Sequence, residues 1–541
     1  MRNNNTDIPK GNSQGFKTAA KDDFVAGFLV FLIALPLCLG ISLASGYPAI
    51  AGIITAIVGG LVATFVSDSE LTIKGPAAGL IVIALGCVTE FGFTGGDDLA
   101  QDFRAYRLAL GVGVGAGVVQ ILFGALRIGS LTEFFPKAAI HGLLAAIGII
   151  IIAKQFPVLL GLHPHGSPLN LLVRIPSFII DMNPKVAFIG ILSIMIVVSY
   201  VLIKNKKLKI IPAPMMMLMA TVPLGLYMGL GGNTTYSFNG KTFDLGEKFL
   251  VNVPLDVIND LTLPDFSGVF TGTGIKYIIL FSIIGALESL LSAKAIDEID
   301  PWKRKTNMDL DMLGIGIGNT LSAFLGGLPM ISEIVRSKAN IDNGAKTRFA
   351  NFYHGMFLLF AVTLIATWIN HIPLAALAAL LVVTGFRLAS PNEFKHMYNL
   401  GKDQFLIFIV TIIAVLETDL LKGIGIGIAL NILLHLFRGV SVVSFFKLNA
   451  EVEDESDKSI KITLRNSIVF STWLILRKHI YHAFKANKQV TIDFSNTFLV
   501  DSHVQSKLHE WEKEFAFNGL EFSILGLDLH QKSGAVLIKR K

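Results

Sequence analysis

Long apolar segments recur along the first four-fifths of this 541-residue chain. Several have eighteen or more residues, which is enough for a helix to cross the hydrocarbon core of a bilayer. Only 16% of the residues are charged, whereas a soluble domain is typically about a quarter charged. The sequence therefore predicts an all-α, multi-pass membrane protein. About fourteen membrane segments are expected: Phe24–Ala44, Ile50–Val66, Ala77–Val88, Leu108–Leu126, Ala138–Phe156, Val186–Ile203, Ile210–Leu230, Ile275–Ala293, Met312–Leu325, a half-helix near Glu333, Phe352–Ile369, Pro373–Leu388, Phe405–Leu416 and Gly423–Leu436.

Short basic segments predict how the chain is oriented in the membrane. If every apolar segment crosses once, Lys10–Lys21, Lys204–Lys209, Lys303–Lys305 and Lys338–Arg348 fall on one side. Lysine and arginine collect in cytoplasmic loops, so this side is the cytoplasm and both termini lie there. The protein is therefore expected in the plasma (inner) membrane, surrounded by lipid. Much of the net charge of +6 lies in these loops, so it is no argument for binding nucleic acid.

The composition divides the chain into four parts. Residues 1–21 are expected to form a polar cytoplasmic tail, and residues 22–446 the membrane domain. Residues 447–458 are rich in Glu and Asp and are predicted to be a linker. Residues 459–541 alternate strand-like segments with amphipathic helical segments, which is typical of a small soluble α/β domain.

A segment with glycine, proline and charge interrupts the apolar pattern in the second half of the chain. Gly326–Arg336 contains two glycines and Pro329, which break a helix, together with Glu333 and Arg336. Such backbone and such charges are tolerated at membrane depth where they line a buried cavity. A short helix starting after Pro329 would direct its N-terminal N–H groups into that cavity and attract an anion. Counted from Pro329, Glu333 lies about one turn into this half-helix.

A matching interruption lies in the first half of the chain, at Thr72–Gly79. Interruptions in corresponding halves indicate the binding site of a transporter. The alternative interpretation is that both interruptions are ordinary turns between helices. The presence of Arg336 in one of them favours a binding site. Arg336 in turn is either a charge that attracts an anion or a side chain that extends to the cytoplasmic surface. The candidate substrate-binding residues are Gly75, Pro76, Ala77, Ala78, Ser332, Glu333, Ile334 and Arg336.

A carboxylate stands within the apolar segment Ile275–Ala293. Glu288 and Ser292 are four residues apart, so they share one face of the expected helix. Their oxygens are suitable ligands for Na⁺, and the carboxyl group alone is able to carry a proton. The alternative is a structural carboxylate paired with Lys294 or Arg336. Glu288 and Ser292 are therefore the candidate Na⁺ or H⁺ site.

The sequence does not indicate an enzyme. It has no phosphate-binding loop of the Walker type and no motif that joins a nucleophile to a base. The histidines are scattered without the spacing of metal ligands, and the two cysteines, Cys38 and Cys87, lie in apolar segments. No cofactor is expected apart from Na⁺ as a coupling ion.

With these features, the chain resembles the SulP family of inorganic anion transporters, which includes sulfate permeases and bicarbonate carriers. The resemblance extends over Asp22–Lys541 and includes a C-terminal domain of the STAS type. It rests on the motifs Gly75–Ala78, Asp300-Pro301, Asn307–Asp309, Gly316–Asn319, Gly326–Pro329, Arg336-Ser337 with Asn340, Gly344–Thr347, Asp493–Ser495 and Val500–Ser502.

The resemblance implies a seven-plus-seven inverted repeat, a core domain that moves against a gate domain, and a cytoplasmic STAS domain in a homodimer. It implies an anion bound between the half-helices that begin near Ala77 and near Glu333. It also implies that Glu288 and Ser292 stand where sodium-coupled bicarbonate carriers bind Na⁺.

Three positions depart from the family pattern. Leu37 stands where many members have Gln, Glu333 where a small uncharged residue is common, and His503 where phosphorylated relatives of STAS domains have a second serine. The expected function is secondary-active transport of bicarbonate or sulfate, coupled to Na⁺ or H⁺. Two alternatives are a proton-coupled nucleobase carrier of the related fold and an anion-sensing membrane protein whose STAS domain is the output.

Overall fold

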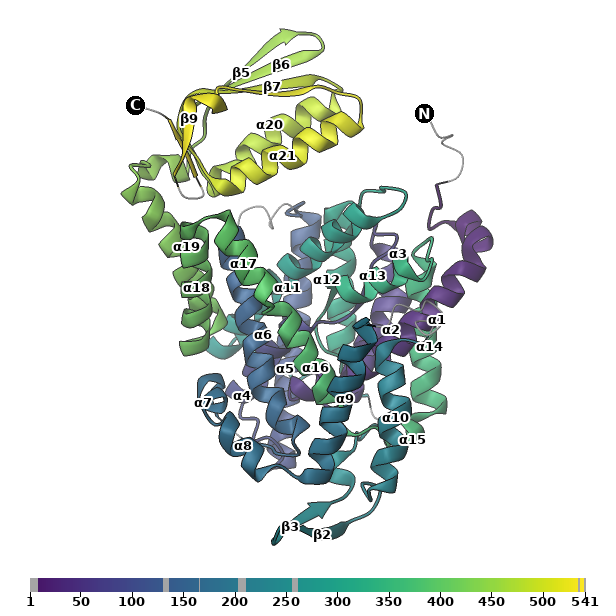
Figure 1. Ribbon diagram of the computed structural model, residues 1–541. Helices are drawn as coiled ribbons and strands as arrows, with labels where there is room; N and C mark the ends of the chain where they lie inside the picture. The colour runs from purple at the N-terminus through teal and green to yellow at the C-terminus, as the bar shows by residue number, and fades with distance from the viewer. Residues whose placement is uncertain are drawn as a thin grey trace. The chain divides into compact units, whose positions relative to one another are not determined.

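The structure is a computed structural model that describes residues 8–129, 136–164, 166–202, 211–254, 261–533 and 536–539 (Figure 1). The chain forms two compact units. The first comprises Met1–Gly129 and Ile147–Arg387, and the second Ser130–Ala146 and Leu388–Lys541. The predicted basic loop Lys204–Lys209 lies outside the described residues.

The first unit is largely helical, and its helices follow the predicted apolar segments. The segment predicted at Ile50–Val66 is one continuous helical stretch in which the π-helical turn Gly59–Ala63 separates α2 from α3. The helices of this unit are α1 (Ser13–Ala44), α2 (Ile50–Val58), α3 (Thr64–Val66), α4 (Ile81–Glu90), α5 (Leu99–Ala125), α6 (Lys137–Leu159, which begins in the second unit), α7 (Pro168–Val173), α8 (Ile175–Asp181), α9 (Pro184–Leu202), α10 (Ala213–Tyr227), α11 (Gly272–Ile299), α12 (Met308–Phe324), α13 (Ile334–Asp342), α14 (Phe349–Leu364), α15 (Ala366–Ile369) and α16 (Leu374–Leu388).

Six helices within the described residues are long and apolar enough to cross a membrane. Several further apolar helices have 10–17 residues. The prediction of a multi-pass helical membrane protein is therefore confirmed. The count of fourteen segments stays a prediction.

A two-stranded hairpin joins α10 to the segment before α11, at the end of the first unit where Figure 1 labels it. Strands β2 (Thr234–Phe238) and β3 (Lys241–Leu245) pair antiparallel. The two turn residues, Asn239 and Gly240, both have positive φ, which is the conformation that Asn-Gly favours in a tight hairpin. The Asn-Gly pair is thus a hairpin signal that is local in the sequence.

Glycines bring α5 and α12 into direct backbone contact. A Cβ atom on Gly117 would lie 2.5 Å from the backbone nitrogen of Thr320, and one on Gly316 would lie 2.5 Å from that of Ile121. Small residues permit such close packing of membrane helices. The position of α12 is therefore fixed closely, which matters because α12 carries polar side chains that support the candidate site.

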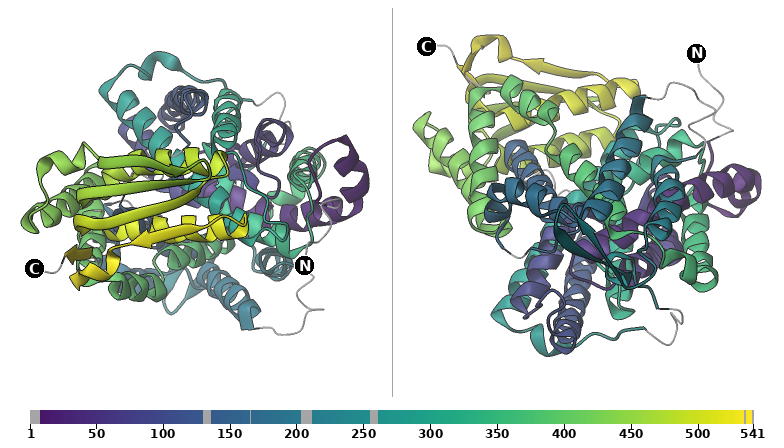
Figure 2. Two further views of the ribbon diagram at one scale, coloured as in Figure 1. Left: turned by 90° about the horizontal axis from the view of Figure 1, so that it is seen from above. Right: turned by 60° about the horizontal axis from the view of Figure 1, so that its bottom comes forward.

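The second unit contains a mixed sheet and its helices. Its strands lie in the order β5-β6-β7-β10-β9, and β8 also pairs with β7. The pairs β6–β7 and β7–β8 are parallel, and the other pairs are antiparallel. Helices α20 and α21 cover one face of this sheet (Figures 1 and 2). The predicted α/β domain is thus present. The elements are α17 (Pro391–Leu400), α18 (Lys402–Glu417), α19 (Leu420–Phe437), β5 (Asn449–Ser456), β6 (Ser459–Ile468), α20 (Trp473–Lys485), β7 (Gln489–Val500), α21 (Ser502–Phe517), β8 (Phe522–Leu525), β9 (His530–Ser533) and β10 (Val536–Lys539).

Regular elements lie inside two of the segments that the composition set apart. Helix α1 begins at Ser13, inside the expected tail 1–21. The acidic segment predicted as a linker at 447–458 contains strand β5, which pairs with β6. Charged side chains are tolerated there because β5 is an edge strand whose acidic residues meet basic neighbours, with Glu451 2.8 Å from Arg465.

A buried pair links α19 to α21 within the second unit. His435 Nε2 lies 3.3 Å from the carboxylate of Asp501, and both side chains are almost fully buried. Burial alone would raise the pKa of Asp501, but the hydrogen bond and charge of His435 and the backbone N–H of His503 lower it to about 2. Asp501 is therefore ionised at neutral pH and holds α19 against the start of α21.

Candidate functional site

The two interrupted segments meet in a short antiparallel ladder. Strand β1 (Ile73–Pro76) pairs with β4 (Met330–Glu333), with Ile73 opposite Glu333 and Pro76 opposite Met330. β1 leads through the 3-10 turn Ala78–Leu80 into α4, and β4 leads directly into α13. The two helix N-termini thus lie at opposite ends of a ladder about 10 Å long, at ~3.3 Å per residue.

Both half-helices begin without a side-chain cap. Neither Ala77, before the turn that opens α4, nor Glu333, before α13, accepts a hydrogen bond from the helix with its side chain. The first N–H groups of a helix have no partner inside the helix, and they carry the positive end of the helix dipole. The candidate residues Ala77, Ala78 and Ile334 are therefore brought to positions where backbone N–H groups are able to bind an anion.

Arg336 lies in the first turn of α13 and reaches across to β1. Its Nη2 donates to the carbonyl oxygen of Pro76 at 2.6 Å, and its Nη1 lies 3.5 Å from Cys38 Sγ. The side chain is 1% exposed, so the alternative of an arginine that extends to the surface is wrong. Gly75 lies against this group: a Cβ atom there would be 2.6 Å from Nη1, so the guanidinium group would have to shift. Nε of Arg336 has no hydrogen-bond partner within the described part of the chain.

Glu333 lies at the entrance to α13 and not one turn inside it. The prediction was wrong because Met330–Glu333 form strand β4, so the helix begins four residues later than Pro329 suggested. Oε1 of Glu333 is 3.7 Å from Nη2 of Arg336, which is an ion pair at i and i+3. The distance is too long for a hydrogen bond, so the contact is ionic only.

Replacing Glu333 by Gln is expected to preserve or raise anion affinity while lowering stability. The change removes a negative charge next to the helix N-terminus, but it leaves Arg336 without its ionic partner. Breaking a buried ion pair lowers the free energy of unfolding by about 3–5 kcal/mol. The 3.7 Å separation places this pair near the lower end of that range. Thermal unfolding and anion binding, both measured on purified Glu333→Gln protein, check this. A large loss of affinity at unchanged stability would instead make Glu333 a ligand or proton carrier.

Glu288 lies against the start of α4. A Cβ atom on Gly79 would overlap the Glu288 carboxyl group, so the carboxyl group is in contact with the backbone there. Oε1 of Glu288 has no hydrogen-bond partner within the described residues, which does not support the alternative of a paired structural carboxylate. Ser292 lies one turn further along α11, and both side chains are 9% exposed. The arrangement leaves a carboxylate oxygen available to a cation or a proton.

Ser332 is held by internal hydrogen bonds. Its N–H donates to Ser289 Oγ at 3.0 Å, and its hydroxyl donates to Asp311 Oδ2 at 3.3 Å. These contacts connect β4 to α11 and to α12. Ser332 therefore supports the ladder, and its role as a direct ligand stays a prediction.

Two charged residues beside the ladder were missed by the sequence analysis. Lys74, in β1, lies 3.3 Å from Asp311 of α12, and both are essentially buried. Lys74 belongs to the Thr72–Gly79 motif, but no role was assigned to it. Asp311 directly precedes the apolar segment Met312–Leu325, where a charge is ordinarily a loop residue. The available signals were a charge inside the first interruption and a charge at the edge of an apolar segment.

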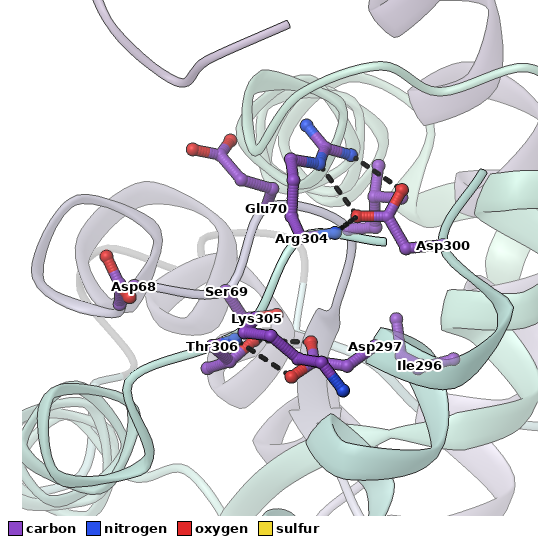
Figure 3. A pocket seen from close by; sticks show the side chains of 10 residues that line it. Asp68, Ser69, Glu70, Ile296, Asp297, Asp300, Arg304, Lys305 and Thr306 are labelled. Carbon is purple, nitrogen blue, oxygen red and sulfur yellow. Dashed lines mark hydrogen bonds and ion pairs between the residues drawn. The ribbon is translucent and has the colours of Figure 1, made fainter. Parts of the chain in front are cut away.

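A pocket elsewhere in the first unit is lined by charged residues but by none of the predicted site residues (Figure 3). Asp300 pairs with Arg304 at 2.7 Å, and Asp297 accepts hydrogen bonds from the N–H and hydroxyl of Thr306. Its charged groups are therefore largely occupied by one another.

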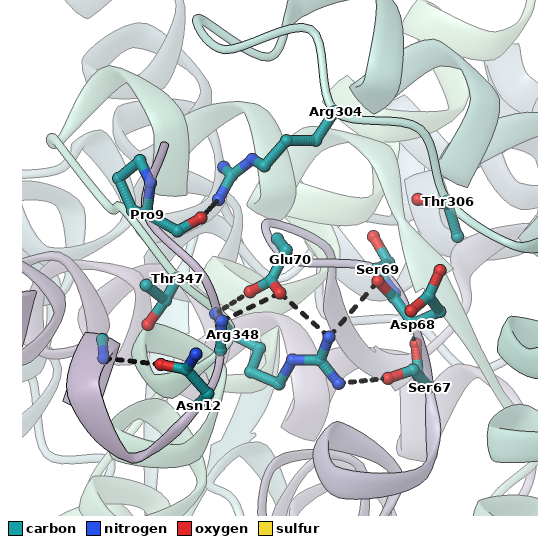
Figure 4. A network of polar contacts seen from close by, with 12 residues as sticks. Pro9, Asn12, Ser67, Asp68, Ser69, Glu70, Arg304, Thr306, Thr347 and Arg348 are labelled. Carbon is teal, nitrogen blue, oxygen red and sulfur yellow. Dashed lines mark hydrogen bonds and ion pairs between the residues drawn. The ribbon is translucent and has the colours of Figure 1, made fainter. Parts of the chain in front are cut away.

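The segment that leads into β1 is anchored by Arg348 (Figure 4). The guanidinium group donates to the carbonyl oxygen of Ser67 at 2.6 Å and lies 3.0 Å from the Glu70 carboxylate. This network holds residues 67–70 in place from the N-cap residue of α14. The start of β1 is thereby fixed from outside the ladder.

The structure is thus a helical membrane fold in which two half-helices meet at a short ladder, with a buried arginine at one helix start. The sequence model of the sulfate permease family matches residues 21–411. The chain therefore belongs to the sulfate permease family, as the resemblance indicated.

Curated relatives agree with this assignment. The chain is 25% identical over 423 residues to the putative sulfate transporter YvdB of Bacillus subtilis (strain 168), covering 77% of this chain and 73% of that protein. It is 23% identical over 444 residues to the bicarbonate transporter BicA of Picosynechococcus sp., covering 82% and 74%.

Solved structures share the fold. The transmembrane domain of a cyanobacterial bicarbonate transporter, BicA, aligns with a TM-score of 0.63 at 21% identity, covering 75% of this chain and 98% of that chain. The overall structure of SLC26A9 aligns with a TM-score of 0.65 at 13% identity, covering 94% and 85%. At these identities the likeness concerns the fold alone.

Proposed function

We propose that this protein is a secondary-active transporter of a small inorganic anion, bicarbonate or sulfate. One observation carries the proposal: the β1–β4 ladder joins two uncapped half-helix N-termini, and Arg336 is buried against the same ladder. Backbone N–H groups, helix dipoles and a guanidinium group together favour an anion. The names of the relatives, sulfate and bicarbonate transporters, are consistent with this class of substrate.

The transport is coupled to Na⁺ or H⁺ through Glu288, with Ser292 as a supporting oxygen. The charged side chains that line the site or support its ladder are Lys74, Arg336, Glu288, Glu333 and Asp311. With all of them ionised, the cluster has one negative charge in excess. One bound Na⁺ or one proton at Glu288 would neutralise it, which favours a cation entering with the anion, because an uncompensated buried charge is costly.

The rest of the architecture follows the family resemblance. The membrane segments form a seven-plus-seven inverted repeat in the plasma (inner) membrane, with both termini in the cytoplasm and lipid around them. The C-terminal α/β domain is a STAS domain, supported by its mixed sheet with helices on one face. The assembly is a homodimer.

A nucleobase carrier of the related fold also uses two carboxylates, and Glu288 and Glu333 fit that pattern. The family match and the pairing of Glu333 with Arg336 favour the inorganic anion instead. An anion sensor with a STAS output would bind the anion without moving it across the membrane.

Uptake into proteoliposomes separates these functions. The purified protein is reconstituted, and labelled bicarbonate, sulfate and uracil are offered with an inward Na⁺ gradient, an inward pH gradient or neither. We expect saturable uptake of one of the two inorganic anions that increases with one of the gradients. Uptake of uracil alone would support the nucleobase carrier, and anion binding without uptake would support the sensor.

A further inference from the structure

The β1–β4 ladder is too short to hold its own alignment. It contains four residue pairs, and Pro76 has no N–H to contribute. An isolated two-stranded ladder is marginally stable, and a slip of one residue would turn every side chain to the other face. The alignment of the two interrupted helices therefore depends on contacts outside the ladder.

Lys74 and Asp311 supply such contacts on one face of the ladder. Lys74 is opposite Ser332 in the pairing, so both side chains point to the same face. Both reach Asp311, Lys74 Nζ at 3.3 Å from Oδ1 and Ser332 Oγ at 3.3 Å from Oδ2. One carboxylate of α12 thus connects both strands at one pair of the ladder.

The ion pair is completed by two hydroxyl groups from the segment before β1. Ser67 donates to Asp311 Oδ1, and Lys74 Nζ donates to Thr72 Oγ1 at 2.6 Å. Lys74, Asp311 and Ser332 are each at most 1% exposed. The pair is therefore fully enclosed and hydrogen-bonded, the condition under which a buried charge pair defines one geometry.

Arg336 lies on the opposite face of the ladder. Successive side chains of a strand alternate between faces, and Gly75, the residue after Lys74, faces the Arg336 guanidinium group. Lys74 and Asp311 thus lie on the face of the ladder opposite Arg336, which is the residue proposed to bind the anion. They act on the site through the position of the backbone.

We propose that Lys74 and Asp311 are positioning residues for the anion site. Their ion pair fixes the register of β1 on β4 and so fixes the direction of the α4 and α13 N-termini. The proposal rests on the proposed function, because it concerns the affinity of the site between those N-termini. Asn319 of α12 supports the same alignment, since it bonds the backbone N–H and carbonyl of Met330.

The double variant Lys74→Met/Asp311→Asn tests this, because it removes both charges without leaving one unpaired. Initial uptake rates of labelled bicarbonate and sulfate into proteoliposomes are measured against concentration. We expect KM to rise at least about tenfold, because a misplacement of 1 Å is able to cost up to about 100-fold. The maximal rate per folded protein should stay within about twofold of the parent. A folded double variant whose KM equals that of the parent would overturn the positioning role.

Matched variants cover the other outcomes. Asp300→Asn/Arg304→Met removes another poorly exposed ion pair of the first unit and should lower stability without changing KM. If the double variant does not fold, the variant Ser67→Ala/Thr72→Val takes its place. It keeps both charges but removes their two hydroxyl partners. KM should then rise about two- to fivefold, because hydrogen bonds to charged groups are lost but act on the site only indirectly. An unchanged KM there would refute the positioning role alone. A parent that transports neither anion would refute the proposed function as well.

Discussion

Replacing Glu288 by Gln is expected to abolish gradient-driven accumulation of the anion. The amide retains the shape of the side chain but is unable to bind a proton or neutralise Na⁺. A tenfold cation gradient stores about 1.4 kcal/mol, so a parent with one-to-one coupling accumulates a monovalent anion up to about tenfold. The variant should equilibrate the anion to a ratio of one, while slow exchange of anion persists. The measurement is the steady-state ratio of internal to external labelled anion.

Asp297→Asn is the matched control for this experiment. It makes the same carboxylate-to-amide change on the same helix, α11, at a residue bonded to Thr306. Coupled accumulation should survive in this variant. Undiminished accumulation in Glu288→Gln would exclude Glu288 from coupling, and equal losses in both variants would indicate a general effect of lost charge on the helix.

Removing the charge of Arg336 is expected to produce the largest loss of anion affinity. Arg336→Met alone would leave Glu333 without its partner, so the informative variant is Arg336→Met/Glu333→Gln. A hydrogen bond to a charged group contributes about 1.5–3 kcal/mol, which corresponds to an affinity about 10- to 150-fold weaker. Anion binding to the purified variant, for example by calorimetry, measures this directly.

Comparison with Glu333→Gln isolates the role of the arginine. That single variant should bind the anion at least as well as the parent, so the loss in the double variant is attributable to Arg336. Arg336→Lys, which keeps the charge but loses the planar fork, should lie between the parent and the double variant. Retained affinity in Arg336→Met/Glu333→Gln would show that the backbone N–H groups bind the anion without the arginine.

The helices of the membrane unit could be predicted closely because their signal is local. The segment predicted at Met312–Leu325 is α12 (Met308–Phe324), and the one predicted at Leu108–Leu126 ends with α5 at Ala125. Apolar length is sufficient to recognise such a helix. The hydrogen bonds of a helix are also made within the segment itself, so no distant partner has to be known.

The ladder and its support could not be predicted because their partners are distant in the sequence. The β4 residues appeared to belong to a half-helix starting at Pro329, since nothing local reveals that Ile73–Pro76 pairs with them. The ion pair of Lys74 and Asp311 joins β1 to α12, which are distant in the sequence, and each charge alone resembles a loop residue. The acidic segment 447–458 resembles a linker in sequence for a similar reason: strand β5 within it is extended because it pairs with β6.

The location of the bound anion tests the central claim most directly. The structure of the purified protein is determined with sulfate, with selenate as a heavier analogue, and with bicarbonate. We predict anion density between the N-termini of α4 and α13, within hydrogen-bond reach of Arg336. Density in the pocket lined by Arg304 and Lys305, with the space between the half-helices empty at saturating anion, would contradict the account.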